Sequence, residues 1–376
     1  MTDSGIILQG PEHTCYYPKF PGVADAVASG GVVVSRTMGV SWCGATDTGK
    51  IPQAVAASKA ADTVILAVGT SIKTPSNGPY IQEGSDALTI ALPGAQPQLI
   101  AEVAAAAKKP VVVVILTATP LDISELLANP KIGAVLHLGV PSTTVAGIDA
   151  LLYGAISPAG RTVQTWYPVA YADQVSIFDF NMRPGPSAFA RPDCTTPKGA
   201  GCPRGTNPGR THRFYVDTPV IPFGFGLSYT RFAYAVQATS RAISLDAVRE
   251  LLRATREARR AFPTIADAAA HPLVGYTINV TNTGTVDADD SVLGFLVPPG
   301  AGVGGVPLQT LFGFERVHVR AGETVDVTLY PTLLDFTFTT TDGTRQALTG
   351  TWGVKFGVAE TRPHGQGYAE TTLAAR

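Results

Sequence analysis

The sequence predicts an α/β domain with a mostly parallel sheet, followed by an all-β sandwich. Between residues 51 and 153, short apolar runs alternate with helical patterns, which is typical of a parallel sheet covered on both faces. Beyond Gly226, apolar residues recur at every second position between turn residues, as in antiparallel sheets. The stretch between them has no periodicity and is rich in Pro, Gly and Arg.

These patterns predict three parts. Residues 1–168 form the α/β domain, whose N-terminal edge we expect to be truncated, and residues 169–226 form an irregular wrapping loop or linker. Residues 227–376 form the sandwich, with a helical insertion at 244–262.

Length and composition indicate a folded chain of two or three domains. The chain has 376 residues, of which 45% are hydrophobic and 15% charged, so it can bury large cores and is unlike a disordered chain. A net charge of −1 provides no basic surface for nucleic acid or an anionic membrane, and a small neutral substrate is a better match. Apolar runs such as Val111 to Leu116 are far shorter than the ~20 residues of a membrane span. The first residues have neither the basic nor the apolar region of a signal peptide.

The elements of the α/β domain follow from their patterns in chain order. Residues 6–8 and 32–34 predict short strands. An Ala-rich helix over 51–61 has Pro52 in its first turn, where the missing amide donor does no harm. Residues 63–68 predict a strand that is apolar on both faces and therefore buried in a parallel sheet. The remaining predicted elements are helices at 96–109, 123–127 and 145–153 and strands at 111–116, 133–138 and 161–167.

The second half predicts about seven short strands and one helix. The helix over 244–262 has Ser244 as its expected N-cap and five Arg against three acids, a composition typical of a solvated face. The wrapping loop before it is too apolar for a free linker, since it contains Phe178, Phe180, Met182, Phe189, Phe214 and Tyr215. The strands are expected at 232–236, 274–280, 292–297, 317–319, 325–330, 336–340 and 352–356, in a sandwich of immunoglobulin type.

The four cysteines, Cys15, Cys43, Cys194 and Cys202, match no zinc or thioredoxin-like spacing. Cys194 and Cys202 flank a loop rich in Gly and Pro that a disulfide would restrain, and free thiols are the open alternative. Asn279-Val-Thr281 has the form of a glycosylation site, although it lies in a predicted strand. These features are two hints of an extracellular protein.

Two further motifs favour structural interpretations. Gly44 to Lys50 has the spacing of a phosphate-binding loop, but Ile51 replaces the Ser or Thr that would hold magnesium and no clear buried strand leads into Gly44. A surface turn before a helix explains the same residues. The six histidines are scattered with no pair at metal-ligand spacing, so we expect no metal site.

The acidic turn Glu83-Gly-Ser-Asp86 follows the buried strand at 63–68, and α/β proteins usually place chemistry at the carboxyl ends of strands. An exposed Glu beside a Gly is often only a turn residue. Alternatively, Glu83 is a general acid that protonates a leaving oxygen if its pKa is raised. For Asp86, helix capping is favoured over sugar binding.

A series of longer motifs runs from the acidic turn to residue 230. In chain order they are Glu83-Gly-x-Asp86, Leu92-Pro-Gly-x-Gln96, Pro120-Leu-Asp122, Ser157-Pro-x-Gly-Arg161 and Thr165-Trp-Tyr-Pro168. Together they resemble the α/β sandwich domain of family 3 glycoside hydrolases. Three more are similar to the branch of β-xylosidases and α-L-arabinofuranosidases: Met182-Arg-Pro184, Gly209-Arg-Thr-His-Arg-Phe-Tyr215 and Pro222-Phe-Gly-Phe-Gly-Leu-Ser-Tyr-Thr230. Leu311 to His318 resembles the family's fibronectin type III-like domain, which implies that fold for residues 227–376.

The resemblance implies a retaining hydrolase whose two carboxylates lie in different domains. The nucleophilic Asp belongs to a (β/α)₈ barrel, and Glu83 is the match to the acid/base position. This sequence has no match to the nucleophile motif, and a barrel takes ~250 residues. The chain is thus identified as the C-terminal part of such an enzyme, inactive without a barrel located upstream or on another chain. The further implications are xylo- or arabino-oligosaccharide substrates, a role in xylan catabolism, an extracellular location, and no metal or organic cofactor.

Several positions depart from the family pattern. Ala87 stands where Arg usually follows the Asp of the acidic turn, and Thr117-Ala-Thr-Pro120 replaces a Gly-Gly-Pro turn. Val140 to Ala146 has likewise lost glycines that allow positive φ. These changes favour a rival interpretation, a non-catalytic carbohydrate-binding or interaction module. A nucleotide-dependent enzyme that uses Gly44 to Lys50 is a third candidate.

Overall fold

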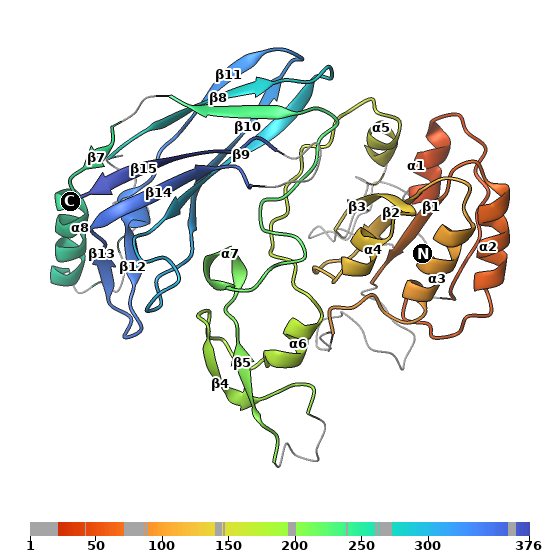
Figure 1. Ribbon diagram of the computed structural model, residues 1–376, viewed down its shortest axis with the longest axis horizontal. Helices are drawn as coiled ribbons and strands as arrows, with labels where there is room; N and C mark the ends of the chain where they lie inside the picture. The colour runs from red at the N-terminus through yellow and green to blue at the C-terminus, as the bar shows by residue number, and fades with distance from the viewer. Residues whose placement is uncertain are drawn as a thin grey trace, which may run out of the picture. The chain divides into compact units, whose positions relative to one another are not determined.

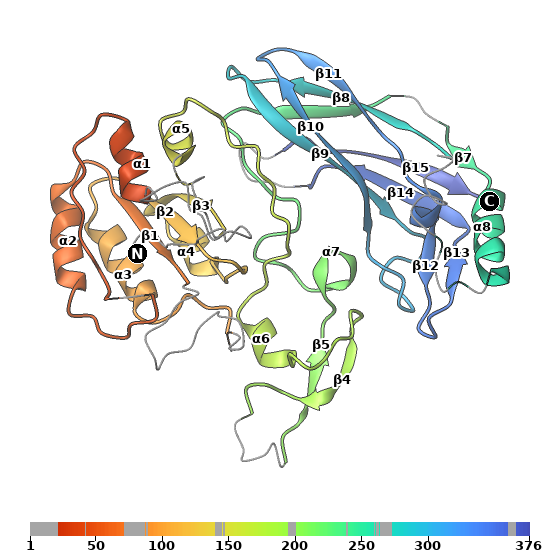
Figure 2. The ribbon, with the colours of Figure 1, turned by 180° about the vertical axis from the view of Figure 1, so that it is seen from behind.

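The computed structural model describes residues 22–41, 43–70, 87, 89–139, 145, 147–194, 201–237, 240–258, 260, 263, 273–359 and 366–376. The chain divides into two compact units, residues 1–155 with 166–173 and residues 156–165 with 174–376. Figure 1 and Figure 2 show the elements of both from opposite sides. In the described ranges, no helix has the length and apolar character needed to cross a membrane.

The first unit is built around a three-stranded parallel sheet. Its strands are β1 (Ile65–Gly69), β2 (Val111–Leu116) and β3 (Ile132–His137), in the spatial order β1-β2-β3. Val112 of the central strand lies opposite Ile65 on one side and Ala134 on the other. The side chains of Val113 and Val114 are fully buried, as expected for a strand covered on both faces.

Helices cover both faces of this sheet (Figure 1). On one face, Ile51 and Leu99 pack against Leu66, and on the other Ile148 packs against Ile65. Because Ile65 and Leu66 are consecutive, they point to opposite faces as strand geometry requires. The helices are α1 (Val23–Ser29), α2 (Ile51–Ala60), α3 (Gln96–Ala106), α4 (Ser124–Ala128) and α5 (Ile148–Leu152).

The predicted helices and strands between 51 and 153 are confirmed, with ends that differ by a few residues. The predicted strand at 32–34 is wrong: this valine run forms no strand and Val33 is fully exposed. The predicted strand at 161–167 is also wrong, because Thr162 bonds to Gly224 and Phe225 of the second unit instead. Helix α1 was not predicted, although Asp25 accepts a hydrogen bond from the Gly22 N–H as an N-terminal capping residue does. The predicted strand at 6–8 lies outside the described residues.

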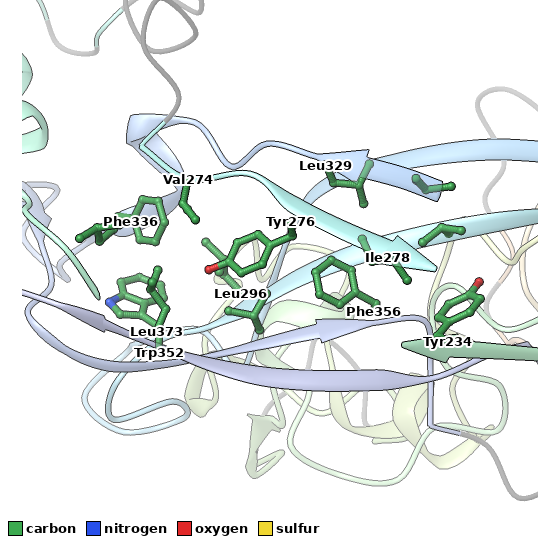
Figure 3. Packing of buried hydrophobic residues seen from close by; sticks show 14 of the residues in the cluster. Tyr234, Val274, Tyr276, Ile278, Leu296, Leu329, Phe336, Trp352, Phe356 and Leu373 are labelled. Carbon is green, nitrogen blue, oxygen red and sulfur yellow. The ribbon is translucent and has the colours of Figure 1, made fainter. Parts of the chain in front are cut away.

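The second unit is a β-sandwich with one core. Consecutive inward positions are buried on both sheets, for example Tyr276 and Ile278 on one and Trp352 and Phe356 on the other. Figure 3 shows these side chains meeting between the sheets. One sheet has the order β10-β9-β14-β15-β7 and the other β11-β8-β6. The strands are β6 (Phe232–Val236), β7 (Ala242–Ile243), β8 (Tyr276–Asn282), β9 (Ala288–Val297), β10 (Thr310–Val319), β11 (Thr324–Leu329), β14 (Gly350–Phe356) and β15 (Ala369–Ala375).

The predicted sandwich is confirmed, with strand ends that differ from the predicted runs by up to seven residues. The structure adds β7, β13 (Arg345–Ala347) and β15, which the sequence pattern missed. The short strand β12 (Thr337–Thr339) pairs with β13 after the 3₁₀ helix η3 (Leu333–Phe336). The inserted helix is α8 (Asp246–Glu257), with Leu245 rather than Ser244 at the N-cap position and no capping side chain. Ser244 instead accepts a hydrogen bond from the Asp246 N–H within the preceding turn.

The predicted wrapping loop contains short regular elements. Strands β4 (Gly185–Ala190) and β5 (Arg204–Asn207) form an antiparallel pair, and a disulfide joins Cys194 to Cys202 beyond its end. Helices α6 (Ala170–Gln174) and α7 (Thr211–Phe214) lie on either side of it in the sequence. Phe214 and Tyr215 are buried, whereas Phe178 and Phe180 are largely exposed.

A buried polar cluster ties residues 156–165 to the sandwich. The Arg161 and Asp290 side chains are 5% and 0% exposed, and Arg161 donates a hydrogen bond to Asp290. The Tyr234 hydroxyl donates to the second Asp290 oxygen at 2.6 Å. Burial, and then the negative charge of Asp290, raises the pKa of Tyr234, so its hydroxyl remains a donor. This cluster explains why residues 156–165 belong to the second unit.

Replacing Asp290 should destabilise the second unit strongly. In Asp290→Asn, the Arg161 guanidinium stays buried without a counter-charge, which costs about 3–5 kcal/mol of unfolding free energy. The matched control is Asp289→Asn, because Asp289 lies on the opposite face of β9 in surface pairs with Arg316 and His318. Exposed pairs contribute at most about 1 kcal/mol. Urea unfolding followed by circular dichroism measures both, and equal midpoints for the two variants would contradict a structural role for the cluster.

Candidate functional site

The predicted acid/base residue Glu83 and its neighbour Asp86 lie outside the described residues. They belong to the segment between β1 and α3, whose residues 71–88 we call the acidic loop. The structure describes both ends of this segment, Thr70 on one side and residues 89–96 on the other. The candidate site is therefore built from the groups that fix these two ends.

The acidic loop departs from the carboxyl end of the parallel sheet. Gly69, the last residue of β1, has φ +140°, and a Cβ there would lie 1.9 Å from the Leu116 carbonyl oxygen, so glycine is required. The Thr70 N–H donates to the same oxygen at 2.9 Å. The Thr70 hydroxyl donates to the Thr117 hydroxyl at 2.8 Å. These bonds keep the ends of β1 and β2 together one residue beyond the strands.

The chain returns to the sheet at Gln96, the first residue of α3. Its side chain is 1% exposed and makes four hydrogen bonds. Its Oε1 accepts the Gly69 N–H at 2.7 Å, and its Nε2 donates to the Gly69 carbonyl at 2.8 Å. The same Nε2 donates to the carbonyls of Cys43 at 2.6 Å and Pro93 at 3.3 Å. One amide thus joins the strand from which the acidic loop leaves to the helix at which it ends.

The turn before α3 is also anchored. Gly94 has φ +62°, and a Cβ there would lie 2.4 Å from the Ala45 carbonyl oxygen. That oxygen accepts the Ala95 N–H at 2.8 Å. Ala45 is buried in the stretch with phosphate-loop spacing. The stretch therefore holds the turn that precedes α3.

The turn after β2 shows how one of the replaced glycines is accommodated. The Thr117 hydroxyl donates to the Thr119 carbonyl at 3.0 Å and accepts the Thr119 N–H at 3.3 Å. Among the described residues, Thr211 is the non-glycine with positive φ, so Thr117 needs no strained conformation. The loss of glycine here leaves a turn closed by a hydroxyl.

Asp122 completes the described part of this edge. Its backbone N–H donates to the Ile90 carbonyl at 2.7 Å, and its carboxylate accepts from the Val169 N–H at 2.7 Å and from Ser124. Burial raises the pKa of Asp122, but the bonds from Ser124 and Val169 outweigh burial and leave the pKa below its ordinary value. The ionised carboxylate of Asp122 thus holds Ser124 and Val169, while its backbone N–H holds residue 90, just beyond the acidic loop.

Sequence reasoning assigned no role to Gln96 or Asp122, although both stood in quoted motifs. The available signal was a polar residue at the start of a helix that directly follows Leu-Pro-Gly. Within the described ranges, no group of three or more His, Cys, Asp or Glu side chains could hold a metal ion. What this arrangement can do is hold a loop that carries a carboxylic acid at the carboxyl end of a sheet.

Gln96→Leu should destabilise the first unit by about 2–5 kcal/mol. The change keeps the volume but leaves the Gly69 N–H and carbonyl buried without partners, and each such group costs about 1–3 kcal/mol. The matched control is Gln98→Leu on the same helix, because Gln98 is exposed and bonds only to Glu102 in the described structure. Hydrogen exchange at the Gly69 amide reports the change directly. Equal protection of this amide in both variants would show that Gln96 does not anchor the strand end.

The second unit contains a histidine in an unusual setting. The His212 ring stacks on Phe223 with centroids 4.2 Å apart and meets Phe295 edge-on at 6.0 Å. Its Nε2 is buried and has no hydrogen-bond partner among the described residues. Burial, and then the charge of Arg213, lowers the pKa of His212 to about 4.

His212 should make the second unit less stable in mild acid. As pH falls below 6.5, His212 becomes protonated in the unfolded chain, whereas in the folded unit it stays neutral until about pH 4. Protons therefore bind the unfolded state preferentially, and the unfolding free energy decreases across this window. With partial solvent exposure we expect roughly 1–2 kcal/mol. His212→Phe keeps the stacking and should lose this component. Urea midpoints at pH 7 and pH 4.5 test it, and an identical pH dependence for both proteins would contradict it.

Comparison with known proteins relates the chain to one family. The model for the glycosyl hydrolase family 3 C-terminal domain matches residues 10–229. A protein of Arabidopsis thaliana named "Probable beta-D-xylosidase 6" is 32% identical over 291 residues, which are 75% of this chain and 34% of that protein. The "Exo-1,4-beta-xylosidase xlnD" of Aspergillus awamori is 31% identical over 283 residues, 74% of this chain and 31% of its own length. The chain thus spans about a third of the length of the curated relatives it matches.

Solved structures show the same fold. A family 3 exo-β-xylosidase (XlnD) in complex with a xylobiose aziridine probe superposes with a TM-score of 0.76 at 24% identity, covering 96% of this chain and 42% of that one. A β-glucosidase from Listeria innocua in complex with isofagomine superposes with a TM-score of 0.64 at 22% identity, covering 95% of this chain and 42% of that one.

Proposed function

Because the chain belongs to glycosyl hydrolase family 3, we propose that it supplies the acid/base half of a retaining β-xylosidase or α-L-arabinofuranosidase, with Glu83 as that residue. The names of the relatives at 30–34% identity support xylosides as substrates. A (β/α)₈ barrel, upstream or on another chain, is proposed to supply the nucleophile. The small substrates are xylo- or arabino-oligosaccharides, and the reaction needs no metal or organic cofactor.

The observation that carries this proposal is the anchoring of the acidic loop at both ends. Thr70 is held by Leu116 and Thr117, and the return is held by Gln96. Fixed ends lower the conformational freedom that must be lost when a carboxylic acid is placed against a substrate. The carboxyl end of a parallel sheet is also where α/β proteins usually carry such groups.

In the proposed reaction, Glu83 acts twice. Its protonated form donates to the glycosidic oxygen while the carboxylate of the barrel attacks the anomeric carbon. Its ionised form then accepts a proton from the water that hydrolyses the glycosyl-enzyme intermediate. The two carboxyl groups in such enzymes lie ~5 Å apart, so one carboxylate alone cannot complete the cycle.

The Cys194–Cys202 disulfide supports the proposed extracellular location. Disulfides persist in secreted proteins and are rare in the reducing cytosol. A role in xylan breakdown outside the cell is consistent with it.

The second candidate function is a non-catalytic carbohydrate-binding or interaction module. It is favoured by Ala87, which has no charge at the position where the family pattern has Arg. The Thr117 turn does not add to this argument, because its hydroxyl closes the turn without glycine.

We expect the purified chain to show no turnover of aryl β-xyloside by itself and to gain turnover when a separately produced xylosidase barrel domain is added. Glu83→Gln should then lower kcat by about 10²–10⁴-fold. The loss should be smaller for a substrate with a dinitrophenyl leaving group, because this group needs little protonation. The control is Glu102→Gln, which changes an exposed glutamate on α3.

Two results would contradict the proposal. Turnover by the chain alone that Glu83→Gln abolishes would show that the chain holds its own nucleophile. Xylo-oligosaccharide binding without turnover, even with the barrel present, would support the non-catalytic module.

A further inference from the structure

The second unit contains a hollow of about 470 Å³ beside α7. A glycine-rich loop at 300–305 and the turn between β12 and β13 contribute to its walls. Its lining combines one guanidinium and backbone groups with apolar surface, and includes Arg183, Pro184, Phe214, Gly305, Leu308 and Thr341.

Arg183 is held rigidly in the wall of this hollow. Its Nε donates to the Gly305 carbonyl at 3.1 Å, and its Nη2 donates to the Thr339 carbonyl. Gly305 has φ +82°, and a Cβ there would lie 2.8 Å from the Arg183 Nε, so this approach requires glycine. In the described ranges, neither Arg183 Nη1 nor the N–H groups of Gly304 and Gly305 have a partner. Arg183 is therefore a donor held in a fixed position in the wall.

Two more arginines bring positive charge to the same place. The guanidinium carbons of Arg183 and Arg213 each lie 5.3 Å from the centroid of the Phe214 ring. Burial, and then repulsion from Arg345 and Arg183, lowers the pKa of Arg213, although an arginine remains charged at any physiological pH. Arg183 and Arg213 therefore lie close to each other beside Phe214, and Arg345 lies close enough to Arg213 to lower its pKa.

Two carboxylates lie near these arginines, and neither is paired with Arg183 or Arg213. Asp335, which acts on Arg345, accepts hydrogen bonds from the Thr332 N–H and hydroxyl at 2.7 Å each. Asp342 accepts from the hydroxyl of Thr340 and the N–H of Thr344 in its own turn. Within the described part of the chain, no carboxylate forms an ion pair with Arg183 or Arg213. The charge of Arg345 is thus balanced by Asp335, whereas the charges of Arg183 and Arg213 have no paired carboxylate among the described residues.

We propose that this hollow binds the carboxylate group of an acidic sugar, a hexuronic acid or its glycoside. Guanidinium groups match planar carboxylates in geometry and charge. The hollow is larger than a free phosphate requires and falls in the range of small-molecule sites, and Pro184, Phe214 and Leu308 offer apolar contacts to ring carbons. That the carboxylate belongs to a sugar rests on the proposed function, whereas the binding of an anion at these arginines does not.

The test is a calorimetric titration of the purified chain with sodium glucuronate, xylose and sodium phosphate. Glucuronate should bind saturably and xylose should not. Thr341→Glu places a carboxylate at the wall and should weaken glucuronate binding by at least about tenfold, whereas Thr341→Gln, of equal size, should change it less than about twofold. Arg213→Gln should also weaken it, and Arg320→Gln, an exposed control, should not.

The outcomes separate this inference from the catalytic proposal, because binding is measured without turnover. Absence of saturable glucuronate binding, or equal binding by Thr341→Glu and Thr341→Gln, would overturn the site. Phosphate binding as tight as glucuronate binding would overturn the acidic sugar as its ligand. If Arg213→Gln fails to fold, the exposed Thr341 pair still decides the question. If the barrel assay shows no hydrolysis, the catalytic proposal fails, but the results of these titrations are unaffected.

Discussion

The candidate site depends on the buried amide of Gln96. Its four hydrogen bonds reach β1, the residues before α2 and the turn before α3, three segments that are distant in the sequence. In a low-dielectric interior these bonds are strong and any unmade one is costly, so the amide permits a single arrangement of the three segments. The same close packing requires glycine at positions 69 and 94, because a backbone oxygen of a neighbouring segment occupies the space that a side chain would need.

The second unit depends on a buried charge in a similar way. Asp290 is inaccessible, and its two oxygens are used by Arg161 and Tyr234. A buried carboxylate is tolerated only when it is paired, so the segment that brings Arg161 must lie against the sandwich. The backbone bonds of Thr162 to residues 224 and 225 extend the same attachment. For this reason residues 161–165, which the sequence pattern assigned to a last strand of the parallel sheet, belong to the second unit instead.

The two units differ in the chemistry they offer. The first fixes the two ends of the segment that contains Glu83, and the second places the guanidinium groups of Arg183 and Arg213 beside Phe214. The net charge of −1 does not reveal this local difference, because it sums the charges of the whole chain without regard to their positions.

The sequence by itself determined the order of elements, the change from a parallel sheet to a sandwich, and the family. Apolar periodicity reports burial locally, so β1, β2 and the alternating core strands were predictable from their own residues. Only the tertiary structure decided which apolar runs pair: Val32 and Val33 are exposed, and residues 161–165 of the predicted strand belong to the second unit. It also assigned Gln96 and Asp122 their positioning roles and brought Arg183, Arg213 and Arg345 together. These outcomes depend on hydrogen bonds and charges between segments far apart in the chain, which no local pattern records.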